Sequence, residues 1–155
     1  MSQIVAFYRD GGTGAGRTFE HVLAMDDIAL ESGHDWVQWM FPLPEPSKAQ
    51  PSSPVMTEAD ITVFRTDPVV RANVDRALTR WMKFMEGNTH WCRERDHNHL
   101  RITRIIRFLT LIGNEDDAEQ VYHTACGMMI HKGDGLPETT KGFWSEARKE
   151  NPAWL

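Results

Sequence analysis

The strongest constraint on the fold is a run of apolar residues that recur every three or four positions between Asp67 and Gly87. This spacing places them on one face of an α-helix. Asp67 is a typical helix cap, Pro68 suits the first helical turn, and Gly87 suits the helix end. The sequence therefore predicts a long amphipathic helix over 67–87, with an inward face made of Val70, Val74, Ala77, Leu78, Trp81 and Met85.

Shorter segments with helical spacing lie on both sides of this helix, and no segment shows sustained strand alternation. Further helices are predicted to begin at Thr18, Asp26 or Asp27, His34, Thr57, Leu100, Asn114 and Glu138.

Two stretches are predicted to be non-helical. The apolar opening Ile4–Tyr8 suggests an extended segment, and five prolines make residues 42–54 an irregular loop. A chain of 155 residues fits one domain. We therefore expect a mainly α fold, a compact single-domain bundle of about six to seven helices spanning residues 1–155.

Composition excludes several classes of protein. The net charge of −5 opposes general attraction to nucleic acid, although Arg101, Arg104 and Arg107 form a basic stripe. No apolar stretch approaches the ~18 residues of a membrane span, and no signal peptide is visible at the N-terminus. Cys92 and Cys126 form no disulfide framework. We expect a cytoplasmic protein that binds no membrane.

Two segments invite a cofactor or metal interpretation. Gly11–Thr18 resembles a phosphate-binding loop, but Arg17 replaces the lysine and no parallel sheet is predicted. His90, Cys92, His97 and His99 are zinc-ligand types without a standard ligand spacing. We expect a flexible turn at the first, a polar loop at the second, and neither cofactor nor metal.

Two dense motifs concentrate the remaining chemistry. Residues 34–42 read HDWVQWMFP, where two tryptophans form an aromatic wall and His34 and Gln38 share a helical face. Residues 96–105 read DHNHLRITRI, where helix N-terminal amides and Arg101 would favour an anion. Buried polar groups need partners, so we expect Asn98 and Arg101 to pair with the first motif.

These two motifs resemble the signature stretches of the opioid growth factor receptor conserved domain. The resemblance extends to Phe7–Arg9, to the helix end at Trp81–Gly87, and to Trp91. The short chain is similar to stand-alone microbial, bacterial-type members. The resemblance implies that the motifs face each other, with His34, Gln38 and Trp39 on one side and His97, Asn98, Arg101 and Arg104 on the other.

Three functions remain open at this point. The first is a module that binds a small molecule or peptide, an anionic one included, through Trp36, Gln38, Trp39, Phe41, Asn98, Arg101 and Arg104. The second is an enzyme in which His34 or His97 moves a proton while Asn98 and Arg101 stabilise negative charge. The third is a buried polar clasp that joins helices. Oligomeric state is not predicted.

Overall fold

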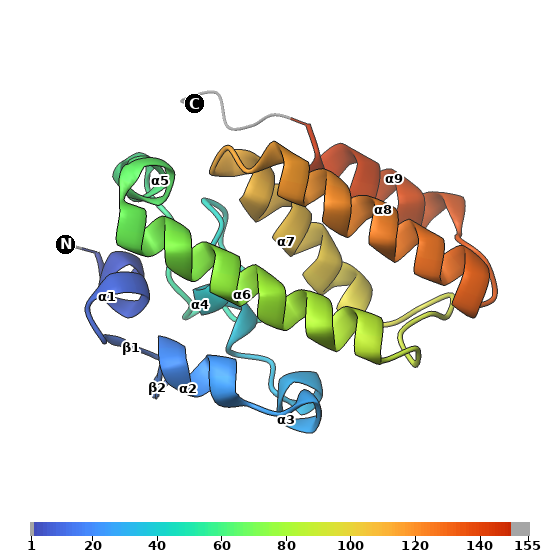
Figure 1. Cartoon of the computed structure of the whole chain (residues 1–155), viewed down its shortest axis with the longest axis horizontal. Coiled ribbons are helices and arrows are strands. Elements are labelled where there is room, and N and C mark those ends of the chain that lie inside the picture. Colours follow the sequence, from blue (N-terminus) through green and yellow to red (C-terminus); the bar gives the residue numbers. More distant parts are fainter. Residues whose placement is uncertain (1, 150–155) are drawn as a thin grey trace. The chain divides into compact units, whose positions relative to one another are not determined.

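The computed structural model describes residues 2–149, and helices dominate it (Figure 1). The mainly α prediction is confirmed. The described residues contain nine helices, against the six to seven expected. The chain divides into two compact units, Met1–Arg80 and Trp81–Leu155. The single-domain organisation stays a prediction.

Unit 1 begins with a helix, α1 (Gln3–Arg9), so the extended opening segment was a wrong prediction. The hydroxyl of Ser2 accepts a hydrogen bond from the Val5 amide and starts the helix. The buried residues Ile4, Phe7 and Tyr8 are three and four positions apart, so a helix places all of them on one inward face.

The glycine-rich segment forms a small β-hairpin. Strands β1 (Thr13–Gly14) and β2 (Arg17–Thr18) pair antiparallel. The two residues between them have positive φ, +50° at Ala15 and +79° at Gly16. Two positive φ values are typical of a type I′ turn, whose twist suits a two-residue hairpin. The turn expected here is therefore the tip of a short β-hairpin.

Three short helices follow the hairpin. Helix α2 (Phe19–Ala24) is capped by Thr18, and α3 (Asp27–Ser32) is capped by Asp26, both as predicted. Helix α4 covers only Val37–Met40, which is shorter than the predicted helix over 34–41. It has no side-chain cap, and the C-terminal end lies just before Pro42.

Residues 42–54 form the predicted irregular loop. Helix α5 (Glu58–Thr66) then begins with a complete capping box. The Thr57 hydroxyl accepts from the Asp60 amide, while the Asp60 carboxylate accepts from the Thr57 amide. Helix α6 (Pro68–Gly87) has the predicted bounds, and the boundary between the two units falls within it.

Unit 2 is built from α7 (Asn98–Leu111), α8 (Glu115–Lys132) and α9 (Glu138–Ala147), which pack against one another (Figure 1). Ile102, Ile105, Ile106 and Leu109 of α7 have no exposed surface. The last helix was predicted to reach Glu150, which lies outside the described residues. Over residues 2–149, no helix combines the length and the apolar character needed to cross a lipid bilayer.

Candidate ligand-binding site

The first motif forms a buried aromatic wall around α4. Trp36, Gln38, Trp39 and Phe41 are all at most 9% exposed. The indole nitrogen of Trp36 donates to the backbone oxygen of Leu30 at 3.0 Å, which fixes that ring on the end of α3. His34 is exposed and precedes α4, so the predicted helical face shared with Gln38 does not form.

The β-hairpin lies directly on this wall. A β-carbon added to Gly14 would meet Cδ2 of Trp39 at 2.2 Å, so only glycine permits the approach. Phe7 packs on Trp39 from α1, with ring centroids 5.6 Å apart. Arg17 Nη1 bonds Asp35 Oδ1 at 2.8 Å. Gly14 thus serves backbone approach to an indole, while Gly16 serves the turn through its positive φ.

Gln38 is the unusual member of the wall. Its side chain is buried, with 5% of the residue exposed, yet its carbonyl oxygen Oε1 accepts no hydrogen bond from any residue that the structure describes. A buried acceptor without a donor costs about 1–3 kcal/mol. Native proteins rarely keep such a group unless it serves water, a ligand or catalysis.

Other polar groups near the wall are satisfied within unit 1. The Tyr8 hydroxyl donates to the backbone oxygen of Met40. Burial raises the pKa of this hydroxyl far above its ordinary value, so Tyr8 stays neutral and acts as a structural donor. The wall is thus held from α1 by Tyr8 and from the hairpin by Arg17.

In the second motif, the carboxylate of Asp96 lies at the start of α7. The Asn98 amide donates to Asp96 Oδ1 at 2.9 Å, and Arg93 Nη2 lies 2.9 Å from Asp96 Oδ2. Burial alone would raise the pKa of Asp96, but these hydrogen bonds and nearby His97 hold the pKa below its usual range. The helix terminus expected to attract an anionic ligand therefore already binds the chain's own carboxylate.

The other predicted residues of this motif lie along α7. Arg101 is buried, and its Nη1 donates to Asn98 Oδ1 at 3.1 Å. Arg104 is half-buried. His97 precedes the helix, and its side chain is 41% exposed. Asn98 and Arg101 are thus brought together, while His97 lies at the surface.

His99 is a central residue that the sequence analysis did not place in the site. Its Nε2 lies 2.8 Å from the backbone oxygen of Trp91, and its ring meets Trp144 edge-on at a centroid distance of 5.6 Å. Trp144 Nε1 in turn donates to the backbone oxygen of His99 at 3.1 Å. The sequence signal that could have indicated this role is a histidine on the inward face of α7 with a tryptophan eight positions earlier.

Of the four zinc-ligand types, Cys92 and His99 are buried, while His90 and His97 are exposed. His99 Nε2 is bonded to Trp91, as above. Cys92 is buried, and burial raises the pKa of its thiol. Gly133 explains part of this burial, because a β-carbon there would lie 2.2 Å from the Cys92 backbone oxygen.

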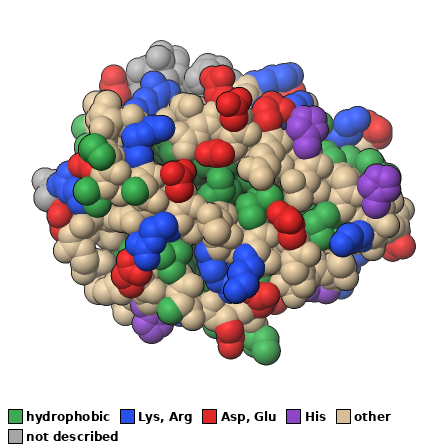
Figure 2. Space-filling view, in the orientation of Figure 1, with side chains coloured by type: hydrophobic (Ala, Val, Ile, Leu, Met, Phe, Trp, Pro, Cys, Tyr) green, Lys and Arg blue, Asp and Glu red, His purple; other side chains and the backbone are tan. Residues whose placement is uncertain are grey.

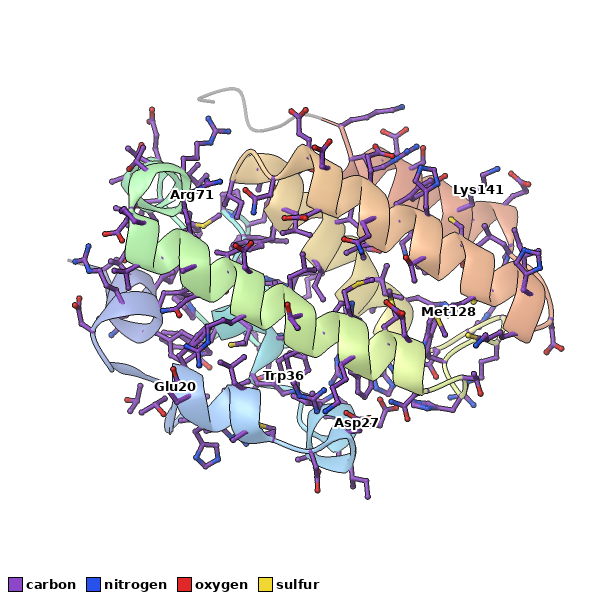
Figure 3. The ribbon with its side chains drawn as sticks, in the orientation of Figure 1. Glu20, Asp27, Trp36, Arg71, Met128 and Lys141 are labelled. Carbon is purple, nitrogen blue, oxygen red and sulfur yellow. The ribbon has the colours of Figure 1, made fainter. Side chains whose placement is uncertain are left out.

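Two arginines of α6 pair with acids of the short helices of unit 1. Arg76 makes two bonds to Glu20, at 2.6 and 2.7 Å, and Arg80 Nη2 lies 2.7 Å from Asp27; Figure 3 labels both carboxylates, on α2 and α3. On the face drawn in Figure 2, basic and acidic side chains are interspersed. An open hollow of about 260 Å³, lined by His21, Ala24 and Met25, contains none of the predicted site residues.

Comparison with known proteins identifies the kind of domain. The opioid growth factor receptor of Rattus norvegicus is 31% identical over 104 residues, which covers 56% of this chain and 18% of the receptor. The chain carries an opioid growth factor receptor-like domain. The receptor of Mus musculus is also 31% identical over 104 residues, and that of Homo sapiens is 30% identical over 107.

The opioid growth factor receptor-like domain spans less than one fifth of these receptors, with 18%, 16% and 15% of their lengths covered. No family model matches the chain, and no solved structure is similar to it. The predicted resemblance to the opioid growth factor receptors is confirmed. The two motifs lie in different units, so their pairing stays a prediction.

Proposed function

We propose that this opioid growth factor receptor-like domain binds a small molecule or a peptide group at its first motif. The unpaired oxygen of buried Gln38 is the observation that carries the proposal. A ligand that offers an N–H or O–H to this oxygen would remove the cost of leaving it unpaired. The similarity to the receptors adds support for a related domain, not for a particular ligand.

The contacts favour a ligand that donates hydrogen bonds over an anion. Two donors of this region are already engaged: the Trp36 indole donates to Leu30, and the Arg17 guanidinium donates to Asp35. In unit 2, Asp96 already occupies the start of α7, and Arg101 binds Asn98. We therefore favour a neutral or cationic group with a flat apolar body, because aromatic side chains flank Gln38 in the sequence.

Three probes of the same shape test this polarity: benzamide, benzamidinium and benzoate. We expect the first two, at millimolar concentration, to raise the melting temperature and shift the indole N–H resonances of Trp36 and Trp39. Gln38→Leu should abolish both effects. Gln38→Glu keeps the acceptor and adds a charge, so benzamidinium should bind it more tightly.

Gln120→Leu is the matched control, because Gln120 is exposed on α8 in unit 2 and should leave the probes unaffected. Equal or stronger binding of benzoate would contradict the proposed polarity. Absence of binding by all three probes, or binding that survives Gln38→Leu, would contradict the proposed site.

For the second motif, the contacts favour the polar clasp. Asn98 accepts from Arg101, Asp96 accepts from the Asn98 amide, and His99 bonds Trp91. We propose that these residues hold unit 2 together. Asn98→Ala should then lower the free energy of unfolding by about 1–3 kcal/mol without changing binding of benzamide, and a selective loss of binding with unchanged stability would contradict the clasp.

A further inference from the structure

The β-hairpin is very short. Each strand has two residues, and the pairing joins only Thr13 with Thr18 and Gly14 with Arg17. Isolated two-stranded hairpins are marginally stable in water. The hairpin therefore depends on what its residues contact outside it.

Its contacts to the first motif are a glycine on an indole ring and one ion pair. Gly14 packs on Trp39, and Arg17 pairs with Asp35 at 2.8 Å. The two charged side chains are 27% and 43% exposed. An ion pair with this exposure contributes about 0–1 kcal/mol of stabilising free energy. It therefore holds the hairpin to the first motif only weakly.

The turn itself favours opening. Ala15 has φ +50°, a left-handed conformation that costs an L-residue roughly 1–2 kcal/mol. This residue is exposed, so packing does not offset the cost. Gly16 adopts its φ of +79° without that penalty.

The two ends of the hairpin are fixed. The Gly12 amide donates to the Ala6 backbone oxygen at 3.0 Å, and the Thr18 hydroxyl accepts from the His21 amide at 3.1 Å. Gly11, with φ +73°, lies just before the first anchor. A local opening would therefore involve only residues 13–17, between an anchor on α1 and the cap of α2.

We propose that residues 13–17 are a gate over Trp39, which opens locally while the helices of unit 1 stay folded. This inference rests on the proposed function in one respect: an open gate would give a ligand access to the first motif. The opening itself does not require a ligand and is measurable without one.

Native-state hydrogen exchange of the full chain tests the opening. We expect the paired amides of residues 13–17 to exchange roughly tenfold or more faster than amides of α5, through a local event with little denaturant dependence. Arg17→Ala should accelerate exchange in 13–17 by about two- to fivefold and leave α5 unchanged. Ala15→Asn should slow it, because asparagine tolerates the left-handed conformation.

Arg76→Ala is the matched control, since it removes another exposed ion pair of unit 1, with Glu20, outside the gate. It should leave exchange in 13–17 unchanged. Exchange of 13–17 only through global unfolding, at the rate of α5, would overturn the gate. Equal acceleration of 13–17 by Arg17→Ala and Arg76→Ala would overturn it as well.

Benzamide separates the gate from the proposed function. Gln38-dependent binding that is slower in Ala15→Asn supports both. Rapid local exchange of 13–17 with no binding supports the gate and contradicts the ligand site. Gln38-dependent binding to a chain whose residues 13–17 exchange only globally supports the site and contradicts the gate.

Discussion

Gly14 and Trp39 are in direct contact, with room for a hydrogen atom but not for a methyl group. A β-carbon on Gly14 would lie 2.2 Å from Cδ2 and 2.6 Å from Cγ of the indole ring. Gly14 and Trp39 are 25 positions apart in the sequence (39 − 14), so this contact joins the glycine-rich segment and the first motif into one structural element.

The first prediction concerns this contact. Gly14→Ala should lower the free energy of unfolding by about 1–3 kcal/mol, measured by urea denaturation, because the ring cannot yield without displacing Phe7. The loss should shrink in a Trp39→Leu background. The control Gly16→Ala has open space around its β-carbon and should cost only about 1 kcal/mol, from its positive φ. If Gly14→Ala cost as much in the Trp39→Leu background as in the parent, the ring would be excluded as the cause of its effect.

The second prediction reverses the usual effect of glycine. Ala15→Gly should raise the free energy of unfolding by about 0.5 kcal/mol, because relief of the left-handed strain exceeds the added freedom of the unfolded chain. Ala72→Gly, at an exposed position within α6, should lower it by about 1 kcal/mol. Denaturation of both variants under one condition gives the comparison. A loss of stability in both would show that the turn carries no strain.

The third prediction concerns His99. His99→Phe keeps a flat ring beside Trp144 but removes the partner of the Trp91 backbone oxygen. We expect a loss of about 1–3 kcal/mol in the free energy of unfolding. The control His131→Phe, at an exposed position, should stay within about 0.5 kcal/mol of the parent at pH 8. Equal small effects of both changes would mean that the hydrogen bond does not stabilise unit 2.

The fourth prediction is a pH dependence from Asp96. Its pKa is lower in the folded protein than in the unfolded chain, so its stabilising effect is fully present above the unfolded value of about 3.9. The effect is lost as the pH falls through the lower folded value. Denaturation at pH 6 and at pH 3 should therefore show that Asp96→Asn destabilises more at pH 6. A difference between parent and variant that is constant with pH would show that the carboxylate charge is irrelevant.

The capped helices were the most predictable part of the fold. Thr57 and Asp60 form a capping box from side chains three residues apart, and Asp67 with Pro68 marks the start of α6. Such signals are local, so a single sequence carries them. α1 was missed because its cap, Ser2, stands at the edge of the chain and its apolar residues were interpreted as an extended opening.

The site was predictable in its residue types but not in its contacts. The sequence identified Trp36, Gln38 and Trp39 as a dense group, and the structure buries all three. It could not indicate that Gly14 would cover Trp39 or that the Asp96 carboxylate would accept the Asn98 amide. The first depends on a long-range approach and the second on a turn geometry. His99 was missed because its partners are a backbone oxygen and a distant tryptophan, neither of which forms a motif.

The boundary between the two units falls between Arg80 and Trp81, inside a single helix of 20 residues. The chain has no loop there that a protease or a recombination event could use to separate them. A fragment cut at this position would lose the hydrogen bonds that each turn of α6 makes to the next. The two compact units are therefore joined by continuous helix, so separating them would require α6 itself to unwind or break.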